Sequence, residues 1–135
     1  MLANRLLGSG VRGFLRYWQQ MPLIKSQQRI RSDWHKQMQA NRLQHSAKGL
    51  AASLVEFGQG NYPNLWPQLY KLQCPTLLIT GEQDDKYCTL AKRMEKYLPN
   101  AQWNFVPDTG HAPHLEAPEQ TALLIKRFSD TFLAN

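Results

Sequence analysis

The order of apolar and polar residues in the first part of the chain predicts an amphipathic helix. Over residues 2–20, apolar side chains recur at steps of three and four, which is the pattern of one helical stripe. Gly8 and Gly10 weaken the early part of this stripe. Pro22 should end the helix, because proline disfavours the helical conformation of the residue before it. The chain therefore opens with a helix that has one face to bury.

Two further helices are predicted before residue 60. Ser32 or Asp33 can cap a helix that runs to about Gln44. Ser46 can cap the next one, and Gly58 is expected to stop it in a left-handed conformation. These helices are short, basic and amphipathic. We therefore expect residues 1–64 to form a helical lid rather than a self-sufficient core.

After a loop rich in Gly, Asn and Pro, the pattern changes to that of an α/β fold. Residues 75–80, PTLLIT, form a continuous apolar run that is typical of a strand buried on both faces. A helix should follow and end at Pro99, a second strand should cover residues 102–106, and Pro118 is well placed to start a terminal helix. Residues 65–135 are thus predicted to form a parallel β-α-β-α unit.

Composition narrows the class of protein. With 135 residues and 42% apolar residues, the chain is neither disordered nor fibrous. No segment approaches the roughly 18 apolar residues of a membrane span, and we expect no signal peptide. Cys74 and Cys88 lack the spacing of a zinc site, so we interpret them as reduced thiols of a cytoplasmic protein.

Charge is unevenly distributed along the chain. Residues 1–50 hold nine Lys and Arg against one acid, a formal charge of +8, whereas residues 51–135 hold seven bases and nine acids, a charge of −2. A basic half can indicate nucleic acid, an anionic membrane surface, a pocket for a small polyanion or a solvated helical face. Nucleic acid is the weaker specific interpretation, because no recognised binding motif accompanies the charge.

Two polar groups follow the predicted strands. Asp84 comes just past the first strand and His111 just past the second. Because the carboxyl ends of parallel strands meet at one edge of a sheet, these side chains should lie together there. A histidine that is oriented by an acid can act as a general base, and a general base needs a nucleophile to activate. No serine stands in a G-x-S-x-G elbow, and Ser9, which lies between two glycines, has the wrong spacing.

The motifs around these two residues resemble the C-terminal third of the α/β-hydrolase fold. They are P-T-L-L-I-T-G-E-Q-D, then a helix and a strand, and then T-G-H-x-x-H-x-E-x-P. In that family a serine, an acid and a histidine occur in this chain order. The resemblance implies that Asp84 orients His111, the general base. Asp85 is expected to face solvent, and His114 is expected to pack or hydrogen-bond locally.

Three stretches resemble more specifically the 2-succinyl-6-hydroxy-2,4-cyclohexadiene-1-carboxylate synthases of menaquinone and phylloquinone biosynthesis. They are Gly81–Tyr87 (GEQDDKY), Phe14–Ile24 (FLRYWQQMPLI) and Asn41–Leu54 (NRLQHSAKGLAASL). The resemblance implies a lyase that eliminates pyruvate from a small polycarboxylate, without a metal or an organic cofactor. It also implies that Trp18 and Arg42 contact the substrate. For Trp18, a place in the core of the lid is an equally good interpretation.

The resemblance covers only the later half of those enzymes, which are about twice as long and also carry an early H-G loop. We therefore expect a truncated gene product, a gene with a mis-assigned start, or one piece of a split enzyme, inactive without the nucleophile half. The expected partner is that missing N-terminal half or a second copy of the chain. Two alternatives stay open, namely a fragment of another α/β-hydrolase such as a carboxylesterase, and a non-catalytic basic binding module. Lys86 is expected to form an ion pair with Asp84 or Asp85.

Overall fold

The computed structural model describes residues 2–133, without the side chains of Gln59 and Leu133. The chain divides into two compact units. One consists of the residues up to Lys25 together with Arg31–Asn64, and the other of Ser26–Ile30 and the residues from Leu65 onward. A short piece from the first part of the sequence therefore packs within the second unit.

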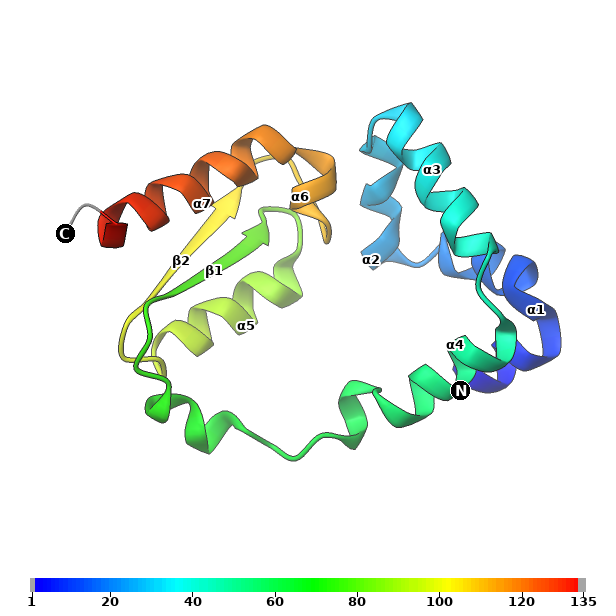
Figure 1. Ribbon diagram of the computed structural model, residues 1–135, viewed down its shortest axis with the longest axis horizontal. Coiled ribbons are helices and arrows are strands. Elements are labelled where there is room, and N and C mark those ends of the chain that lie inside the picture. The colour runs from blue at the N-terminus through cyan, green and yellow to red at the C-terminus, as the bar shows by residue number, and fades with distance from the viewer. Residues whose placement is uncertain (1, 134–135) are drawn as a thin grey trace. The chain divides into compact units, whose positions relative to one another are not determined.

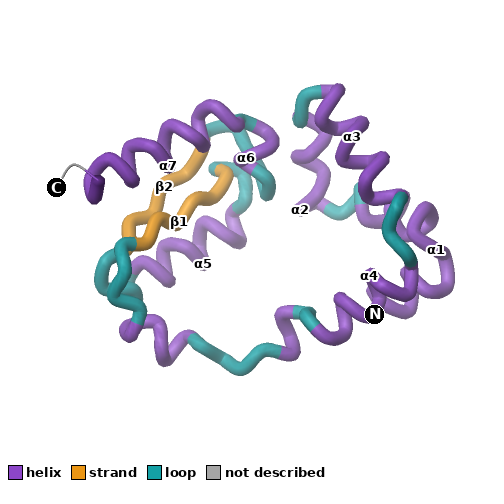
Figure 2. The backbone as a smooth tube through the Cα atoms, in the orientation of Figure 1, coloured by secondary structure: helices purple, strands orange, loops and turns teal. Residues whose placement is uncertain are grey.

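The first unit is helical (Figure 2). Its described elements are α1 (Leu2–Trp18), α2 (Pro22–Lys25), α3 (Ser32–Leu43), α4 (Ala47–Glu56) and the 3₁₀ turn η2 (Gln59–Asn61). Leu6 and Phe14 of α1 are buried with Ala51 of α4 and form its core. The helix predicted from residue 2 is confirmed. It bends at Gly10, whose φ of 65° is a conformation that glycine adopts at little cost.

The start of α3 differs from the prediction. The N-cap residue is Arg31, and neither Ser32 nor Asp33 has that role. Asp33 lies in the first helical turn, where its Oδ2 accepts a hydrogen bond from Arg31 Nη2 at 3.0 Å. The predicted cap is wrong because the helix begins one residue earlier and the arginine engages the carboxylate.

The N-terminus of α4 agrees with the prediction, and its C-terminus differs from it. Ser46 caps the helix as expected, since its Oγ accepts a hydrogen bond from Gly49 N at 2.9 Å. Gly58, by contrast, is not left-handed, because its φ is −63°. A Cβ at this position would lie 2.3 Å from the carbonyl oxygen of Leu54. Glycine at position 58 therefore allows a close approach rather than a left-handed stop.

The second unit is a small parallel sheet with helices on its two faces (Figure 1). Its described elements are η1 (Ser26–Arg29), η3 (Trp66–Lys71), β1 (Thr76–Gly81), α5 (Asp85–Glu95), β2 (Ala101–Val106), α6 (Pro113–Glu116) and α7 (Pro118–Leu133). The strands pair in parallel, with Thr76 opposite Ala101 and Gly81 opposite Val106. Helix α5 lies on one face of the sheet and α7 on the other. The predicted β-α-β-α order is confirmed, and η1 and α6 are additions to it.

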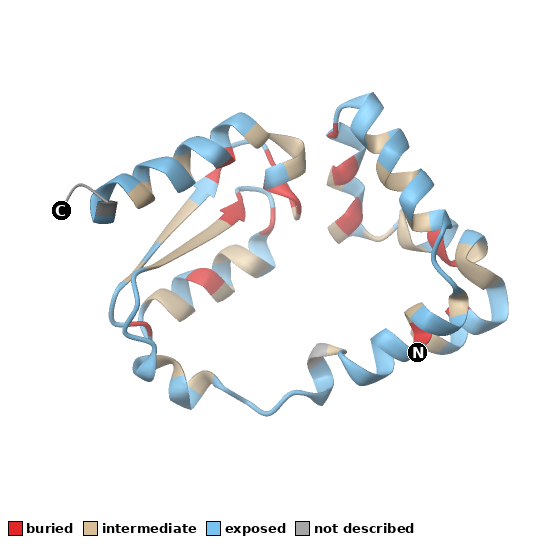
Figure 3. Cartoon of the chain, viewed as in Figure 1, coloured by how far each residue is buried: buried red, intermediate tan, exposed pale blue. Residues whose placement is uncertain are grey.

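The sheet is buried mainly at its carboxyl end (Figure 3). Residues 76–79 of β1 are half-buried, whereas Thr80 and Gly81 are buried. Phe105 of β2 exposes 44% of its surface. The prediction of a strand buried on both faces is therefore wrong for most of β1. The reason is that, among the described residues, the sheet has only two strands, so its faces are incompletely covered.

Within residues 2–133, every helix is too short or too polar to cross a membrane.

Candidate active site

Asp84 and His111 meet at the carboxyl end of the sheet, as the motifs predict. His111 Nδ1 lies 2.7 Å from Asp84 Oδ2. The carboxylate side chain is 5% exposed and the imidazole 30% exposed, so the acid is enclosed while the histidine reaches the surface. Because a carboxylate accepts hydrogen bonds, Nδ1 carries the proton and Nε2 is the ring nitrogen that can take one. This is the arrangement of a base oriented by an acid.

The second oxygen of Asp84 binds the helix that follows it. Oδ1 accepts a hydrogen bond from the backbone N–H of Tyr87 at 3.3 Å, which makes Asp84 the N-cap of α5. The positive end of a helix dipole stabilises a negative charge at this position. Asp85 is exposed in the first turn of the same helix. The structure therefore places Asp84, and not Asp85, against the histidine.

The loops that carry the two residues are fastened to each other. The backbone N–H of Gln83 donates to the carbonyl oxygen of Thr109 at 2.9 Å. At the end of β1 the backbones approach so closely that a Cβ on Gly81 would lie 2.0 Å from the carbonyl oxygen of Gly110. Any side chain at position 81 would push the histidine loop away from Asp84.

An aromatic ring packs on the histidine, and a lysine lies over that aromatic ring. The ring of Tyr87 packs on His111, with centroids 4.8 Å apart and planes inclined by 56°. Lys86 Nζ lies 5.6 Å from the centroid of the Tyr87 ring. The expected ion pair between Lys86 and Asp84 or Asp85 is wrong, since no such pair forms among the described residues. The ammonium group lies over the aromatic ring instead.

The two predicted substrate contacts belong to the first unit. Trp18 is partly buried against the core of α1 and α4, and its ring stacks on Phe14 with centroids 5.7 Å apart. Arg42 lies in the last turn of α3, where its Nη1 is buried and burial lowers the pKa of the guanidinium. Substrate contact by Trp18 and Arg42 stays a prediction. The alternative interpretation of Trp18 as lid core matches the packing of its ring.

Two residues that sequence reasoning misses also contact the histidine loop. Glu116 and Ser26 hydrogen-bond to its backbone. Glu116 carries a signal, because it stands five residues after His111 in the T-G-H-x-x-H-x-E-x-P motif. Ser26 carries none, because 85 positions separate it from His111. His114, which was expected to have no chemical role, is exposed on α6.

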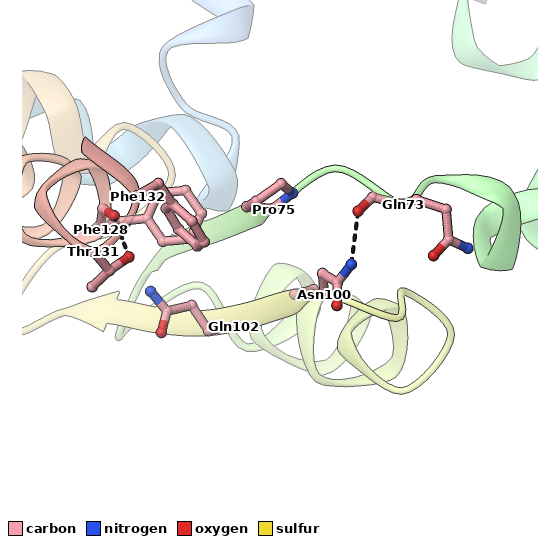
Figure 4. Close-up of a pocket in the computed structure, with 8 residues that line it drawn as sticks. Gln73, Pro75, Asn100, Gln102, Phe128, Thr131 and Phe132 are labelled. Carbon is pink, nitrogen blue, oxygen red and sulfur yellow. Dashed lines mark hydrogen bonds between the residues drawn. The ribbon is translucent and has the colours of Figure 1, made fainter. Parts of the chain in front are cut away.

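The opposite end of the sheet carries a separate cleft (Figure 4). Its volume is about 510 Å³. Its lining comes from the amino ends of the strands and the end of α7, and includes Gln73, Asn100, Gln102, Phe128 and Phe132. Because the dyad of Asp84 and His111 lies at the carboxyl end of the strands, this cleft is not part of the candidate site. Among the described residues, no group of three or more His, Cys, Asp or Glu side chains is placed to hold a metal ion.

The curated proteins that resemble the chain include two 2-succinyl-6-hydroxy-2,4-cyclohexadiene-1-carboxylate synthases. The chain is 36% identical, over 94% of its length, to the putative 2-succinyl-6-hydroxy-2,4-cyclohexadiene-1-carboxylate synthase of Bacillus subtilis, and covers 46% of that protein. It is 26% identical, over 96% of its length, to the 2-succinyl-6-hydroxy-2,4-cyclohexadiene-1-carboxylate synthase of Photorhabdus laumondii, of which it covers 44%. No family model matches the chain.

Comparisons with solved structures agree. MenH from S. aureus matches with a TM-score of 0.91 and 32% identity, over 96% of this chain and 48% of that one. A thermophilic esterase from Thermogutta terrifontis, solved with malate bound, matches with a TM-score of 0.75 and 25% identity, over 96% and 47%.

The fold is that of the C-terminal part of an α/β-hydrolase. Within that class, the resemblance to the 2-succinyl-6-hydroxy-2,4-cyclohexadiene-1-carboxylate synthases is confirmed. The chain spans about half the length of the relatives it matches.

Proposed function

We propose that the chain supplies the acid–histidine dyad and the arginine-bearing helices of a lyase that resembles 2-succinyl-6-hydroxy-2,4-cyclohexadiene-1-carboxylate synthase. The serine nucleophile of that site lies outside these 135 residues, because no G-x-S-x-G elbow occurs among them. These 135 residues by themselves are then inactive, and activity requires the other half of the hydrolase fold.

One observation carries this proposal. His111 Nδ1 lies 2.7 Å from Asp84 Oδ2 at the carboxyl edge of a sheet, within a chain that matches MenH from S. aureus with a TM-score of 0.91. The two residues thus have the contact that an acid and a general base of this fold require. The name of the Bacillus subtilis relative supplies the reaction that the proposal assigns to them.

The chemistry follows from the orientation of the imidazole. Nε2 of His111 takes the proton of the serine hydroxyl, and the enclosed carboxylate of Asp84 stabilises the imidazolium that forms. The serine oxygen then abstracts a proton from carbon in the substrate. The electron pair of that C–H bond forms a carbon–carbon double bond as the bond to the leaving oxygen breaks, and pyruvate departs. The proton taken from carbon has already restored the serine hydroxyl, and the imidazolium proton goes to the departing enolate, which becomes pyruvate.

The basic charge of the first half suits a substrate with several carboxylates. Arginine binds carboxylates through paired, charge-assisted hydrogen bonds, which a lysine does not reproduce. Arg42 is the arginine that the synthase resemblance assigns to this role. Its position in the last turn of α3 with Nη1 buried holds the guanidinium more firmly than a surface arginine would be held.

Reconstitution tests the proposed function. The chain is mixed with the part of the Bacillus subtilis relative that the match leaves out, and pyruvate release is measured from the polycarboxylate precursor of 2-succinyl-6-hydroxy-2,4-cyclohexadiene-1-carboxylate. The mixture should release pyruvate, and neither component should do so alone. If the two components bind each other and the complex releases no pyruvate, the proposed reaction is refuted.

Ester hydrolysis is the second candidate function. The likeness to the Thermogutta terrifontis esterase favours it, since a TM-score of 0.75 shows the same framework in a hydrolytic enzyme. The same reconstituted pair is therefore assayed with short-chain aryl esters. Turnover of esters without release of pyruvate would select hydrolysis over the lyase reaction.

A further inference from the structure

A carboxylate lies beneath the loop that carries His111. Glu116 Oε2 accepts a hydrogen bond from the backbone N–H of Gly110 at 2.8 Å. Its Oε1 accepts one from the backbone N–H of Ala112 at 3.1 Å. The two backbone groups that flank the histidine thus converge on one half-buried side chain.

Ser26 completes the set from a distant part of the sequence. Its Oγ accepts a hydrogen bond from the backbone N–H of His111 at 3.3 Å and donates one to Glu116 Oε1 at 2.9 Å. Three successive backbone N–H groups, those of residues 110–112, therefore bond to one serine–glutamate pair. A Cβ on Gly110 would lie 2.3 Å from Ser26 Oγ, so the glycine permits this approach.

The same 3₁₀ turn holds the loop at a second point. Arg29, at the end of η1, donates from Nη1 to the carbonyl oxygen of Asp108 at 2.7 Å. Asp108 has a φ of 55°, a conformation that few residues other than glycine adopt without cost. The turn η1 thus contacts the histidine loop both before and at His111.

From this geometry we propose that Glu116 and Ser26 are positioning residues for His111. They fix the backbone on both sides of the histidine, and the backbone direction sets where the imidazole can reach. The proposal deepens the proposed function, because it concerns the same dyad. Neither residue touches the reacting atoms, and each acts through the 2.7 Å contact between His111 and Asp84.

The charge of Glu116 explains why a carboxylate is required. It accepts three hydrogen bonds, from two backbone groups and one hydroxyl, and hydrogen bonds to a charged acceptor are the stronger ones. An amide at the same position would turn an NH₂ group toward one of these donors. The histidine loop would then lose a contact and gain a repulsion, and a displacement of about 1 Å is enough to cost a general base on the order of 100-fold in rate.

Proton NMR of the full 135-residue chain, labelled with ¹⁵N-histidine, tests the proposal without any substrate. The Nδ1–H of His111 should give a downfield signal that exchanges slowly with water, and Asp84→Asn should abolish it, which assigns the signal. In Glu116→Gln and in Ser26→Ala, exchange of this proton should accelerate by about tenfold or more, the change expected when a hydrogen bond to a charged group is lost. Glu119→Gln, at an exposed position in the first turn of α7, is the matched control and should leave exchange unchanged.

The outcomes separate this inference from the proposed function. Ser26→Ala removes only one hydroxyl, so it keeps the test valid if Glu116→Gln fails to fold. An exchange rate that is unchanged in the folded variants would overturn the positioning role, and so would the absence of the signal from the wild-type chain. Failure of the reconstituted pair to release pyruvate would instead contradict the lyase reaction and leave the NMR result standing.

Discussion

At the scale of single residues, Asp84 divides its two oxygens between the histidine and the helix that follows. Asp84→Asn keeps the size of the side chain but turns its NH₂ or oxygen against a ring that needs an anionic acceptor. We expect pyruvate release by the reconstituted pair to fall on the order of 10⁴-fold, as expected when a triad carboxylate becomes an amide. The measurement is kcat.

Asp85→Asn is the control for this substitution. Asp85 is exposed in the first turn of α5 and lacks the contact with His111 that Asp84 makes. Its amide variant should retain kcat within about twofold, as surface substitutions usually do. If the two variants lose activity equally, Asp84 has no special role in orienting the histidine.

Arg42 is the residue on which substrate recognition is predicted to depend. Arg42→Ala should raise KM for the polycarboxylate substrate by about tenfold or more, because a charge-assisted hydrogen bond contributes about 1.5–3 kcal/mol. Arg42→Lys should not restore the wild-type KM, since a lysine cannot form the paired contact. Lys48→Ala, at an exposed position of α4, should leave KM unchanged. An unchanged KM in Arg42→Ala contradicts the assignment.

At the scale of elements, β1 and the histidine loop can pack closely because Gly81 has no side chain. In Gly81→Ala the new Cβ would lie 2.0 Å from the carbonyl oxygen of Gly110 and 2.5 Å from that of Thr109, so a backbone has to move. We expect the free energy of unfolding to fall by about 1–3 kcal/mol, the usual cost of overpacking. Denaturant titration followed by circular dichroism measures it.

Gly60→Ala serves as the matched control for this substitution. Gly60 is exposed, and a Cβ there would meet no atom within 4 Å. Its alanine variant should unfold at the same denaturant concentration as the wild type. Equal stability of the two variants would mean that the loop can move away from β1 without cost.

Elements with a strong local signal are the ones that the sequence predicts correctly. The stripe from residue 2 and the Ser46 cap each depend on residues within a few positions, and α1 and α4 form as expected. Errors arise where a close backbone approach or contacts with distant residues decide the outcome. Gly58 approaches the carbonyl oxygen of Leu54, and the burial of β1 depends on which strands lie beside it.

The candidate site shows the same division. Asp84 and His111 could be found because each follows a strand and stands in a motif. Ser26 could not be found, because nothing near residue 26 indicates that η1 packs in the second unit with the loop around His111. Lys86 was assigned the wrong partner, since sequence spacing does not distinguish a neighbouring carboxylate from a neighbouring ring.

At the scale of the whole molecule, the sheet is incomplete in the residues described. Phe105, Ile125 and Phe132 of the second unit expose between 44% and 50% of their surface. Burial of apolar surface stabilises the folded state by about 25 cal/mol for each Å². The exposed surface of these side chains does not provide this stabilisation. We therefore expect the chain alone to be only marginally stable and to unfold at a lower temperature than the reconstituted pair.

Calorimetry checks this expectation. Addition of the part of the Bacillus subtilis relative that the match leaves out should raise and sharpen the transition, because a partner that binds the folded state stabilises it. A cooperative transition in a dilute monomer, unaffected by that addition, would show that the chain is a complete folding unit.

We propose that His111, oriented by Asp84, is the base of a lyase site whose nucleophile lies outside these 135 residues. The most direct measurement is pyruvate release by the reconstituted pair with wild-type, His111→Ala and His114→Ala chains. His114 is the control, because it lies three residues after His111 and is exposed on α6. We expect pyruvate release with the wild-type and His114→Ala chains and its loss with His111→Ala. Equal release with His111→Ala, or none with the wild-type chain, would contradict it.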